Sequence, residues 1–276
     1  MKNILVIGSE HCVAQELLLS DHESEDLYNF FESEVILEKG FKLHSEEHYE
    51  VCLFFSKVDH RVYEIFKKKI HSKCDKTIFI QDVNSLDFLK DRIVLATNGV
   101  YSNFGENELN SLYNKIERGE IVTVEETNTL NPISSTQLLK IIERCIDIDI
   151  DPGVYHTGSN IPVSRQFLYM LFFRFSDITY NINYDDTIPN QQEFNNIRIS
   201  EITGHDFILL EKDILNTLRI RKKFPMIIGD LYIIDDVQYV IRAVNNSSKT
   251  VLLATIDDME TCFEFDFHEL TTDKRA

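Results

Sequence analysis

The sequence predicts an α/β protein, in which a doubly wound parallel sheet is followed by a small all-β module. Short apolar runs alternate with segments whose apolar residues recur at helical spacing, and this is typical of parallel strands joined by helices. The first such unit is complete: the run 4–7 ends at Gly8, and residues 13–18 then carry apolar side chains at helical spacing. Beyond Arg221 the alternation stops, and short strands with hairpin turns replace it.

The elements after this first unit follow in chain order. A connecting helix is expected over the acidic segment 21–34. Buried strands are expected at 34–37, 49–55, 77–80, 93–96 and 121–124. Further helices are expected at 60–70 with Asp59 as its cap, at 107–118 closed by Gly119, and at 135–145 with Ser134 or Ser135 as its cap. Strands alternating with helices imply right-handed crossovers between parallel strands.

The C-terminal segment has a different pattern. Alternating strands are expected at 229–234, 237–244, 249–256 and 262–267, which suggests a small SH3-like barrel or a curled meander. Phe263, Phe265 and Phe267 should share one face of the last strand. So small a core is marginal alone, so we expect this module, residues 226–276, to dock on the main domain, residues 1–220, and to bind a protein partner.

Composition limits the class of protein. The chain has 276 residues and a formal net charge of −18, which disfavours binding to nucleic-acid phosphates. The basic runs 67–69 and 219–223 are expected to be solvated helix ends. No apolar run approaches the roughly 20 residues that a bilayer requires. No membrane contact is therefore expected. The five cysteines are scattered without metal-ligand spacing, so no metal site is expected, and the protein is expected to be cytoplasmic.

The first strand and turn have the frame of a Rossmann-like nucleotide site. In that fold the pyrophosphate lies on glycines after the first strand and at the helix N-terminus. His11 and Ala14 stand at the steps where the later glycines are expected. The cofactor-binding candidates are Gly8, Ser9, His11, Val13 and Ala14. Gly8 fits either a phosphate contact or a simple turn at the end of the strand, and His11 fits a turn residue better than a base.

An ordered set of motifs then resembles one family. Residues 93–101 (IVLATNGVY), Phe104-Gly105, 131–135 (NPISS) before a helix, 153–159 (GVYHTGS) and the helix after Ser164 occur in this order. They resemble the extended short-chain dehydrogenase/reductases, and especially the dTDP-4-dehydrorhamnose reductase-like sugar-nucleotide reductases. The resemblance covers roughly residues 1–220 and implies a degenerate NAD(P)-binding domain with a reduced substrate subdomain. It also implies that Asn98, Gly99 and Tyr101 stand where relatives contact substrate, although a structural turn fits these residues somewhat better.

The catalytic dyad of that family is Tyr-x-x-x-Lys on a helix, preceded by Ser or Thr at a strand end. Tyr63 and Lys67 match the spacing, but they stand one unit too early in the chain. The dyad is expected between the strands 77–80 and 93–96, and residues 81–92 contain no Tyr. We therefore assign no catalytic residue, and we expect Tyr63 and Lys67 to be ordinary helix residues.

Three functions are compatible with these observations. The first is a catalytically silent sugar-nucleotide-reductase-like protein that acts as a binding, regulatory or scaffold subunit; the regulatory subunit of methionine adenosyltransferase is such a precedent in this family. The second is an active NAD(P)-dependent sugar-nucleotide reductase or epimerase with a displaced dyad. The third is a purely structural assembly subunit. No cofactor is expected in the first and third, and NAD(P) is expected in the second.

Overall fold

The computed structural model describes a large part of the chain. The described residues are 2–20, 26–31, 48–55, 57–83, 89, 91–105, 107–118, 120, 122–124, 129–159, 161–176, 182–184, 195–223, 231–234, 237–245, 250–255 and 262–266.

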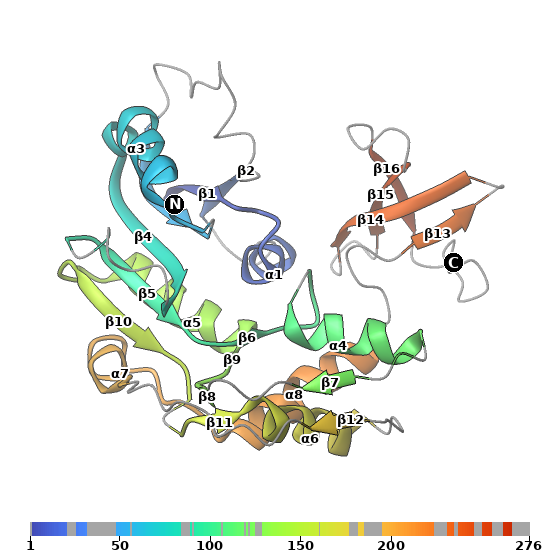
Figure 1. The fold of residues 1–276 in the computed structure, drawn as a ribbon. Helices are drawn as coiled ribbons and strands as arrows, with labels where there is room; N and C mark the ends of the chain where they lie inside the picture. Colours follow the sequence, from blue (N-terminus) through green and yellow to red (C-terminus); the bar gives the residue numbers. More distant parts are fainter. Residues whose placement is uncertain are drawn as a thin grey trace.

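The centre of the molecule is a six-stranded parallel sheet (Figure 1). Its strands are β1 (Asn3–Ile7), β2 (Leu27–Phe31), β3 (Tyr49–Phe54), β4 (Cys74–Asp82), β5 (Ile93–Thr97) and β10 (Gly153–Thr157). They lie in the order β10-β5-β4-β3-β1-β2, and every neighbouring pair is parallel. The order reverses between β1 and β3, and ligands of open α/β sheets bind at such a switch point, outside the carboxyl ends of the strands. The predicted α/β class is confirmed.

Helices cover both faces of this sheet. Alternate residues of β1 point to opposite sides, so Ile4 and Val6 belong to one core and Leu5 and Ile7 to another. The first core is completed by α1 (Cys12–Ser20), α5 (Ser135–Asp147) and α7 (Ile197–Thr203). The second is completed by α3 (His60–Lys69), which is followed by the short helix η2 (His71–Lys73).

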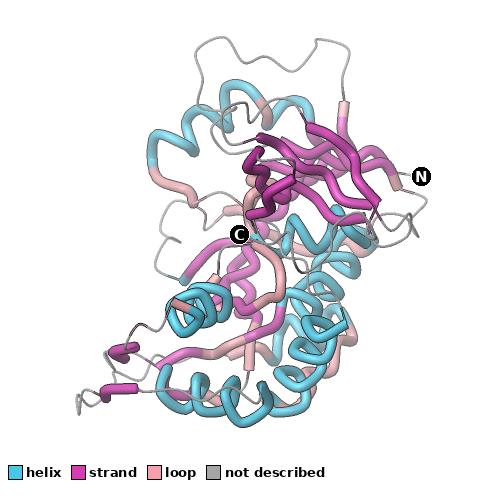
Figure 2. The backbone as a smooth tube through the Cα atoms, turned by 90° about the vertical axis from the view of Figure 1, so that its right-hand side faces the viewer, coloured by secondary structure: helices cyan, strands magenta, loops and turns pink. Residues whose placement is uncertain are grey.

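A mainly helical lobe lies below the sheet (Figure 2). Its helices are α4 (Glu108–Glu117), α6 (Arg165–Ser176) and α8 (Leu210–Lys223), which pack around a third core. Short paired strands connect this lobe to the sheet. The pairs are β6 (Val100–Tyr101) with β9 (Ile133–Ser134), β8 (Thr129–Leu130) with β11 (Val163–Ser164), and β7 (Val122–Val124) with β12 (Ile182–Tyr184).

The two predicted helix caps are confirmed, and Asn107 caps α4 as well. Asp59 accepts a hydrogen bond from the Val62 amide at 2.8 Å, and Asn107 accepts from the Leu109 amide at 3.0 Å. Ser134, rather than Ser135, caps α5. Each cap satisfies a backbone amide that the first helical turn leaves without a partner. Gly119 lies outside the described residues.

The segment 21–34 differs from the prediction. Residues 27–31 form the edge strand β2, which pairs with β1 in parallel register, instead of a connecting helix. The apolar residues Leu27, Phe30 and Phe31 fit helical spacing, but pairing with β1 fixes an extended backbone, so tertiary contact overrides local pattern. The strand expected at 34–37 lies outside the described residues.

The C-terminal module contains the four predicted strands. They are β13 (Leu231–Ile234), β14 (Val237–Asn245), β15 (Thr250–Thr255) and β16 (Cys262–Asp266), and they pair antiparallel in chain order. Phe263 pairs with Leu253 and Phe265 with Val251, and the common face expected for the phenylalanines stays a prediction. Phe267 lies outside the described residues. β14 lies against α1, and closure of this sheet into a barrel stays a prediction.

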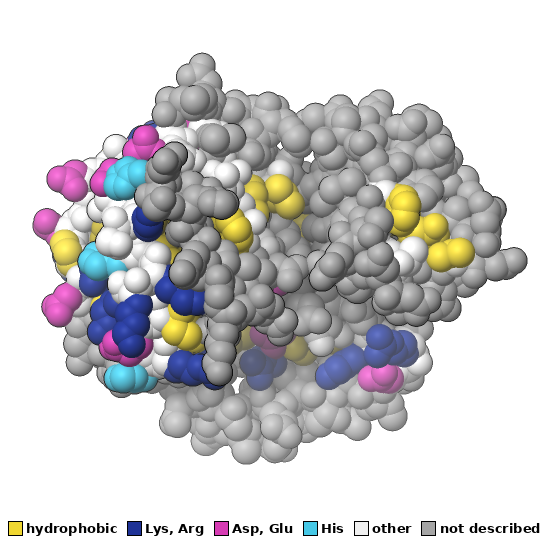
Figure 3. Space-filling view, turned by 90° about the horizontal axis from the view of Figure 1, so that it is seen from above, with side chains coloured by type: hydrophobic (Ala, Val, Ile, Leu, Met, Phe, Trp, Pro, Cys, Tyr) yellow, Lys and Arg dark blue, Asp and Glu magenta, His cyan; other side chains and the backbone are white. Residues whose placement is uncertain are grey.

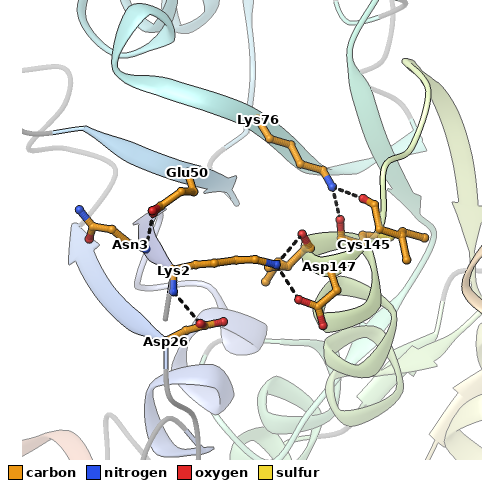
Figure 4. A network of polar contacts seen from close by, with 9 residues as sticks. Lys2, Asn3, Asp26, Glu50, Lys76, Cys145 and Asp147 are labelled. Atoms are coloured by element: carbon orange, nitrogen blue, oxygen red, sulfur yellow. Dashed lines mark hydrogen bonds and ion pairs between the residues drawn. The ribbon is translucent and has the colours of Figure 1, made fainter.

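Two lysines close the C-terminal end of α5 at the amino edge of the sheet (Figure 4). Lys76 donates to the carbonyls of Cys145 and Ile148, and Lys2 donates to the Ile146 carbonyl at 3.2 Å. Burial lowers the pKa of the Lys76 ammonium. Cations at this position complement the negative end of the helix dipole, so they tie α5 to β1 and β4 at the edge opposite the switch point of the sheet.

Candidate functional site at the carboxyl edge of the sheet

The first turn lies at the switch point of the sheet. β1 ends at Ile7, and the Phe55 amide donates to the Ile7 carbonyl at 2.8 Å, which holds the end of β3 beside it. Gly8 has a φ of 89°, a conformation that glycine adopts without strain. The five cofactor-binding candidates are therefore brought together where a doubly wound fold holds a dinucleotide.

The backbone amides of this turn are bonded within the chain. Gly8 and Ser9 both donate to the Phe31 carbonyl, at 2.8 and 3.1 Å, and His11 donates to the Gly8 carbonyl at 3.0 Å. The Val13 amide donates to the His11 Nδ1 atom at 3.3 Å. Pyrophosphate binding at a helix N-terminus uses amides that point at the ligand. At four positions of this turn the donors already have partners.

His11 fills the space between the turn and β3. Its ring stacks on Phe55 with centroids 5.3 Å apart and an interplanar angle of 24°. Burial lowers the pKa of His11 to about 4, although Glu10 opposes this shift. The imidazole is therefore neutral at physiological pH and supplies no positive charge to a phosphate group.

A loop from the lower lobe covers the N-terminal turn of α1. Ser102, Asn103 and Phe104 are buried, and Gly105 follows with a φ of 60°. A Cβ atom at Gly105 would overlap the Gln15 Oε1 atom and would lie 3.2 Å from the Cys12 Cα atom. A side chain here would require the end of Gln15 to move and would crowd the backbone of α1, so the loop is fitted closely against α1.

A buried carboxylate lies one turn further along α1. The Glu16 carboxylate accepts from the Ser135 hydroxyl and, at 2.6 Å, from the Thr136 hydroxyl at the start of α5. Burial raises the pKa of Glu16, and these hydroxyl groups only partly oppose the shift. This contact ties the predicted nucleotide helix to α5.

Asp213 of α8 is the centre of a second buried cluster. Its carboxylate accepts from the Tyr101 hydroxyl at 2.6 Å, the Ser134 hydroxyl at 2.7 Å and the Ser134 amide at 3.1 Å. Burial, together with the Asp213 charge, raises the pKa of Tyr101 well above its ordinary value. Sequence reasoning missed Glu16 and Asp213, because nothing local to either residue indicates that it is buried.

The three predicted substrate residues lie together after β5. The Asn98 side chain donates to the Thr129 carbonyl at 3.1 Å, and the Gly99 carbonyl accepts from the Ile133 amide at 3.0 Å. Tyr101 is 1% exposed. All three are bonded into the junction between the sheet and the lower lobe, and their contact with a substrate stays a prediction.

The Tyr63–Lys67 pair lies on α3, on the face of the sheet opposite α1. The Tyr63 hydroxyl accepts from Arg92 Nε at 3.1 Å, and Lys67 forms an ion pair with Glu64. Near the end of β4, the Gln81 side chain is buried and accepts from the Val58 amide at 3.0 Å. These groups are not assembled around the first turn.

Within the described residues, no three His, Cys, Asp or Glu side chains are grouped so that they could hold a metal ion. No helix in the described part of the chain is both long and apolar enough to cross a membrane.

Comparison with known proteins agrees with this architecture. No family model matches the sequence, and no curated protein matches it. Among solved structures, UDP-glucose 4-epimerase from Bifidobacterium longum in complex with NAD+ and UDP superposes with a TM-score of 0.61 at 14% identity, over 81% of this chain and 99% of that one. The dTDP-4-dehydrorhamnose reductase from Bacillus anthracis in complex with NADP gives 0.59 at 12% identity, over 79% and 98%.

The chain has the fold of these sugar-nucleotide enzymes. A dTDP-glucose 4,6-dehydratase from Bacillus anthracis in complex with NAD matches in the same way, with a TM-score of 0.59 at 13% identity over 81% of this chain and 97% of that one. The resemblance to extended short-chain dehydrogenase/reductases that the sequence motifs indicated is thus confirmed at the level of the fold.

Proposed function

We propose that this chain is a catalytically silent relative of the sugar-nucleotide reductases and acts as a binding, regulatory or scaffold subunit. The observation that carries the proposal is the hydrogen bonding of the first turn. The amides of Gly8, Ser9, His11 and Val13 all have partners within the chain. A dinucleotide would have to break these bonds before its pyrophosphate could use the same donors, and each bond that is lost and not replaced weakens binding.

The surroundings of the turn support the same proposal. The His11 ring occupies the space beside Phe55, where it is neutral, and the loop that ends at Gly105 is fitted against α1. The Tyr-x-x-x-Lys pair, Tyr63 with Lys67, lies on the face of the sheet opposite α1. Among the described residues, this pair therefore does not supply an acid for carbonyl reduction at the first turn.

The C-terminal module is the surface that we assign to a protein partner. Phe263 and Val237 are 44% and 41% exposed, and Phe263 meets the edge of Tyr239 with ring centroids 6.2 Å apart. Exposed apolar side chains of this kind can contribute to an interaction surface, although other exposed apolar side chains, such as Ile161 and Leu209, lie outside the module. About a fifth of the chain lies outside each match to the sugar-nucleotide enzymes, a share that residues 226–276 would account for.

The alternative is an active NAD(P)-dependent reductase or epimerase. The observation that favours it is the fold itself, because the superposing enzymes were solved with NAD, NAD+ or NADP. A displaced dyad would then use Tyr63. We expect Tyr63→Phe to leave any NAD(P)H-dependent reductase activity unchanged, whereas loss of a general acid lowers a rate by about a hundredfold or more.

Calorimetric titration of the full chain with NADH and with NADPH tests the proposal. We expect no binding tighter than about millimolar, which corresponds to roughly −4 kcal/mol. A micromolar dissociation constant for either cofactor would contradict catalytic silence. Native mass spectrometry of protein purified from its source then separates a subunit that joins a partner enzyme from one that only builds an assembly.

A further inference from the structure

A basic surface stands out on this acidic molecule. The stretch 57–73 carries six Lys or Arg residues and two acidic ones, although the whole chain has a net charge of −18. The cations are Lys57, Arg61, Lys67, Lys68, Lys69 and Lys73, and the acids are Asp59 and Glu64. Two histidines, His60 and His71, lie in the same stretch. We call this stretch the α3 basic surface.

The fold turns these charges toward solvent. α3 buries Phe66 completely against the sheet, and Ile70 after it is also fully buried. The side chains of Lys57, Arg61 and Lys68 are exposed. Figure 3 looks down on the end of the molecule where α3 lies in Figure 1, and Lys, Arg and His side chains lie on one part of the described surface there, with Asp and Glu side chains beside them.

The acids within the stretch do not neutralise it. Asp59 accepts from the Val62 amide as the helix cap, and Glu64 is paired with Lys67. Within the part of the chain that the structure describes, Lys57, Arg61 and Lys68 form no side-chain hydrogen bond or ion pair. The positive charge is therefore available to a second molecule.

Helix stability explains only half of this pattern. Lys67, Lys68 and Lys69 lie in the last turn of α3, where cations complement the helix dipole. Arg61 lies in the first turn and Lys57 just before it, where the same dipole disfavours positive charge, and the first turn contains no acid. The cations at this end have no benefit within the helix, so they point to an external partner.

We propose that the α3 basic surface docks an acidic segment of a protein partner. A nucleic-acid partner is disfavoured because the rest of the chain is acidic. A duplex carries a negative charge about every 1.7 Å along its axis, so it would extend beyond α3 over acidic parts of the protein that repel it. A short acidic segment can contact α3 alone, since exposed charges are screened beyond about 8 Å at physiological salt. This inference does not depend on whether the first turn binds a dinucleotide.

A direct binding experiment with the full chain tests the inference. The probes are a short fluorescent peptide rich in Glu and Asp, a DNA duplex of the same length, and vesicles that contain anionic phospholipid. We expect the peptide to bind and its affinity to fall as salt is raised. The double variant Arg61→Glu/Lys68→Glu should lose about tenfold or more in peptide affinity.

The matched control is Lys140→Glu/Lys212→Glu, which changes the net charge equally at exposed positions of α5 and α8. It should bind the peptide within about twofold of the unchanged chain. Thermal unfolding of all three proteins verifies that they remain folded. Absence of peptide binding, equal losses in both variants, or tighter binding of the duplex or the vesicles would each overturn the proposal.

Discussion

At the scale of single residues, two buried carboxylates connect elements that are far apart in the chain. Asp213 accepts three hydrogen bonds from Tyr101 and Ser134, and Glu16 accepts from the two hydroxyl groups that open α5. Buried charges are tolerated only where such partners surround them. These two acids therefore connect α1, α5 and α8 through specific bonds as well as through apolar packing.

Asp213→Ala is expected to destabilise the protein strongly. The change leaves the Tyr101 hydroxyl and two donors of Ser134 buried without an acceptor, and such losses amount to about 3 kcal/mol or more. Tyr101→Phe is the matched control, because it removes one donor and leaves Asp213 with its other partners, at about 1 kcal/mol. Urea unfolding measures both. Equal losses in the two variants would show that Asp213 is not the centre of the cluster.

Glu16 should make stability depend on pH in a defined direction. Burial raises the pKa of Glu16 in the folded state above the ordinary value of 4.5, which we take for the unfolded state. Between the unfolded-state pKa and the folded-state pKa, the folded protein holds a proton that the unfolded protein releases. The free energy of unfolding therefore falls as pH rises through that window. Glu16→Gln removes this titration, so the variant should gain stability relative to the unchanged chain as pH rises.

Urea unfolding of both proteins between about pH 4.5 and pH 8 tests this expectation. The exposed Glu201→Gln on α7 is the control for loss of a carboxylate. Parallel curves for the unchanged chain and Glu16→Gln would contradict the expectation, since one titrating group contributes up to about 1.4 kcal/mol per pH unit.

The local features were predictable from sequence, and the long-range ones were not. Asp59 and Ser134 act on amides three residues away, so their cap roles were predictable from the sequence itself. The burial of Glu16 depends on Ser135 and Thr136, which are distant in the chain. The same reason explains the strand β2, whose apolar spacing also fits a helix and whose conformation is fixed by pairing with β1.

At the scale of elements, the approach of the loop that ends at Gly105 to α1 is the tightest feature of the candidate site. Gly105→Ala should destabilise the protein by about 3 kcal/mol, because the new Cβ overlaps Gln15 and the residue has a positive φ. Gly204→Ala is the matched control: its φ is 64°, but nothing lies within 4 Å of the new atom, so about 1 kcal/mol of backbone strain is expected alone.

Urea unfolding separates the two glycine variants. A larger loss at Gly105 supports close contact between this loop and α1. If both variants lose the same free energy, the overlap with Gln15 relaxes at no cost, and the loop does not restrict the first turn as described.

At the scale of the whole molecule, the C-terminal sheet is attached to the element that carries the candidate site. β14 lies against α1, and Figure 1 places the four strands beyond that helix. Leu253 and Ala254 are consecutive in β15 and point to opposite faces, yet both are fully buried. Both faces of β15 are therefore covered at these two residues, whereas a flat sheet with nothing packed against it would leave both faces exposed to solvent.

Truncation after Pro225 should consequently weaken the main domain as well as remove the module. The truncated chain exposes the surface of α1 that β14 contacts, so we expect a melting temperature lower by several degrees, where about 1 kcal/mol corresponds to 2–4 °C for a chain of this size. Differential scanning calorimetry and light scattering measure the shift and any association through the exposed surface. A shortened chain that stays monomeric, equally heat-stable and able to hold the same partners would show that the module neither stabilises the sheet nor recruits a partner. In that case the C-terminal strands would be an independent unit, and α1 would hold its place through its apolar packing on the sheet, through Glu16 and through the loop at Gly105.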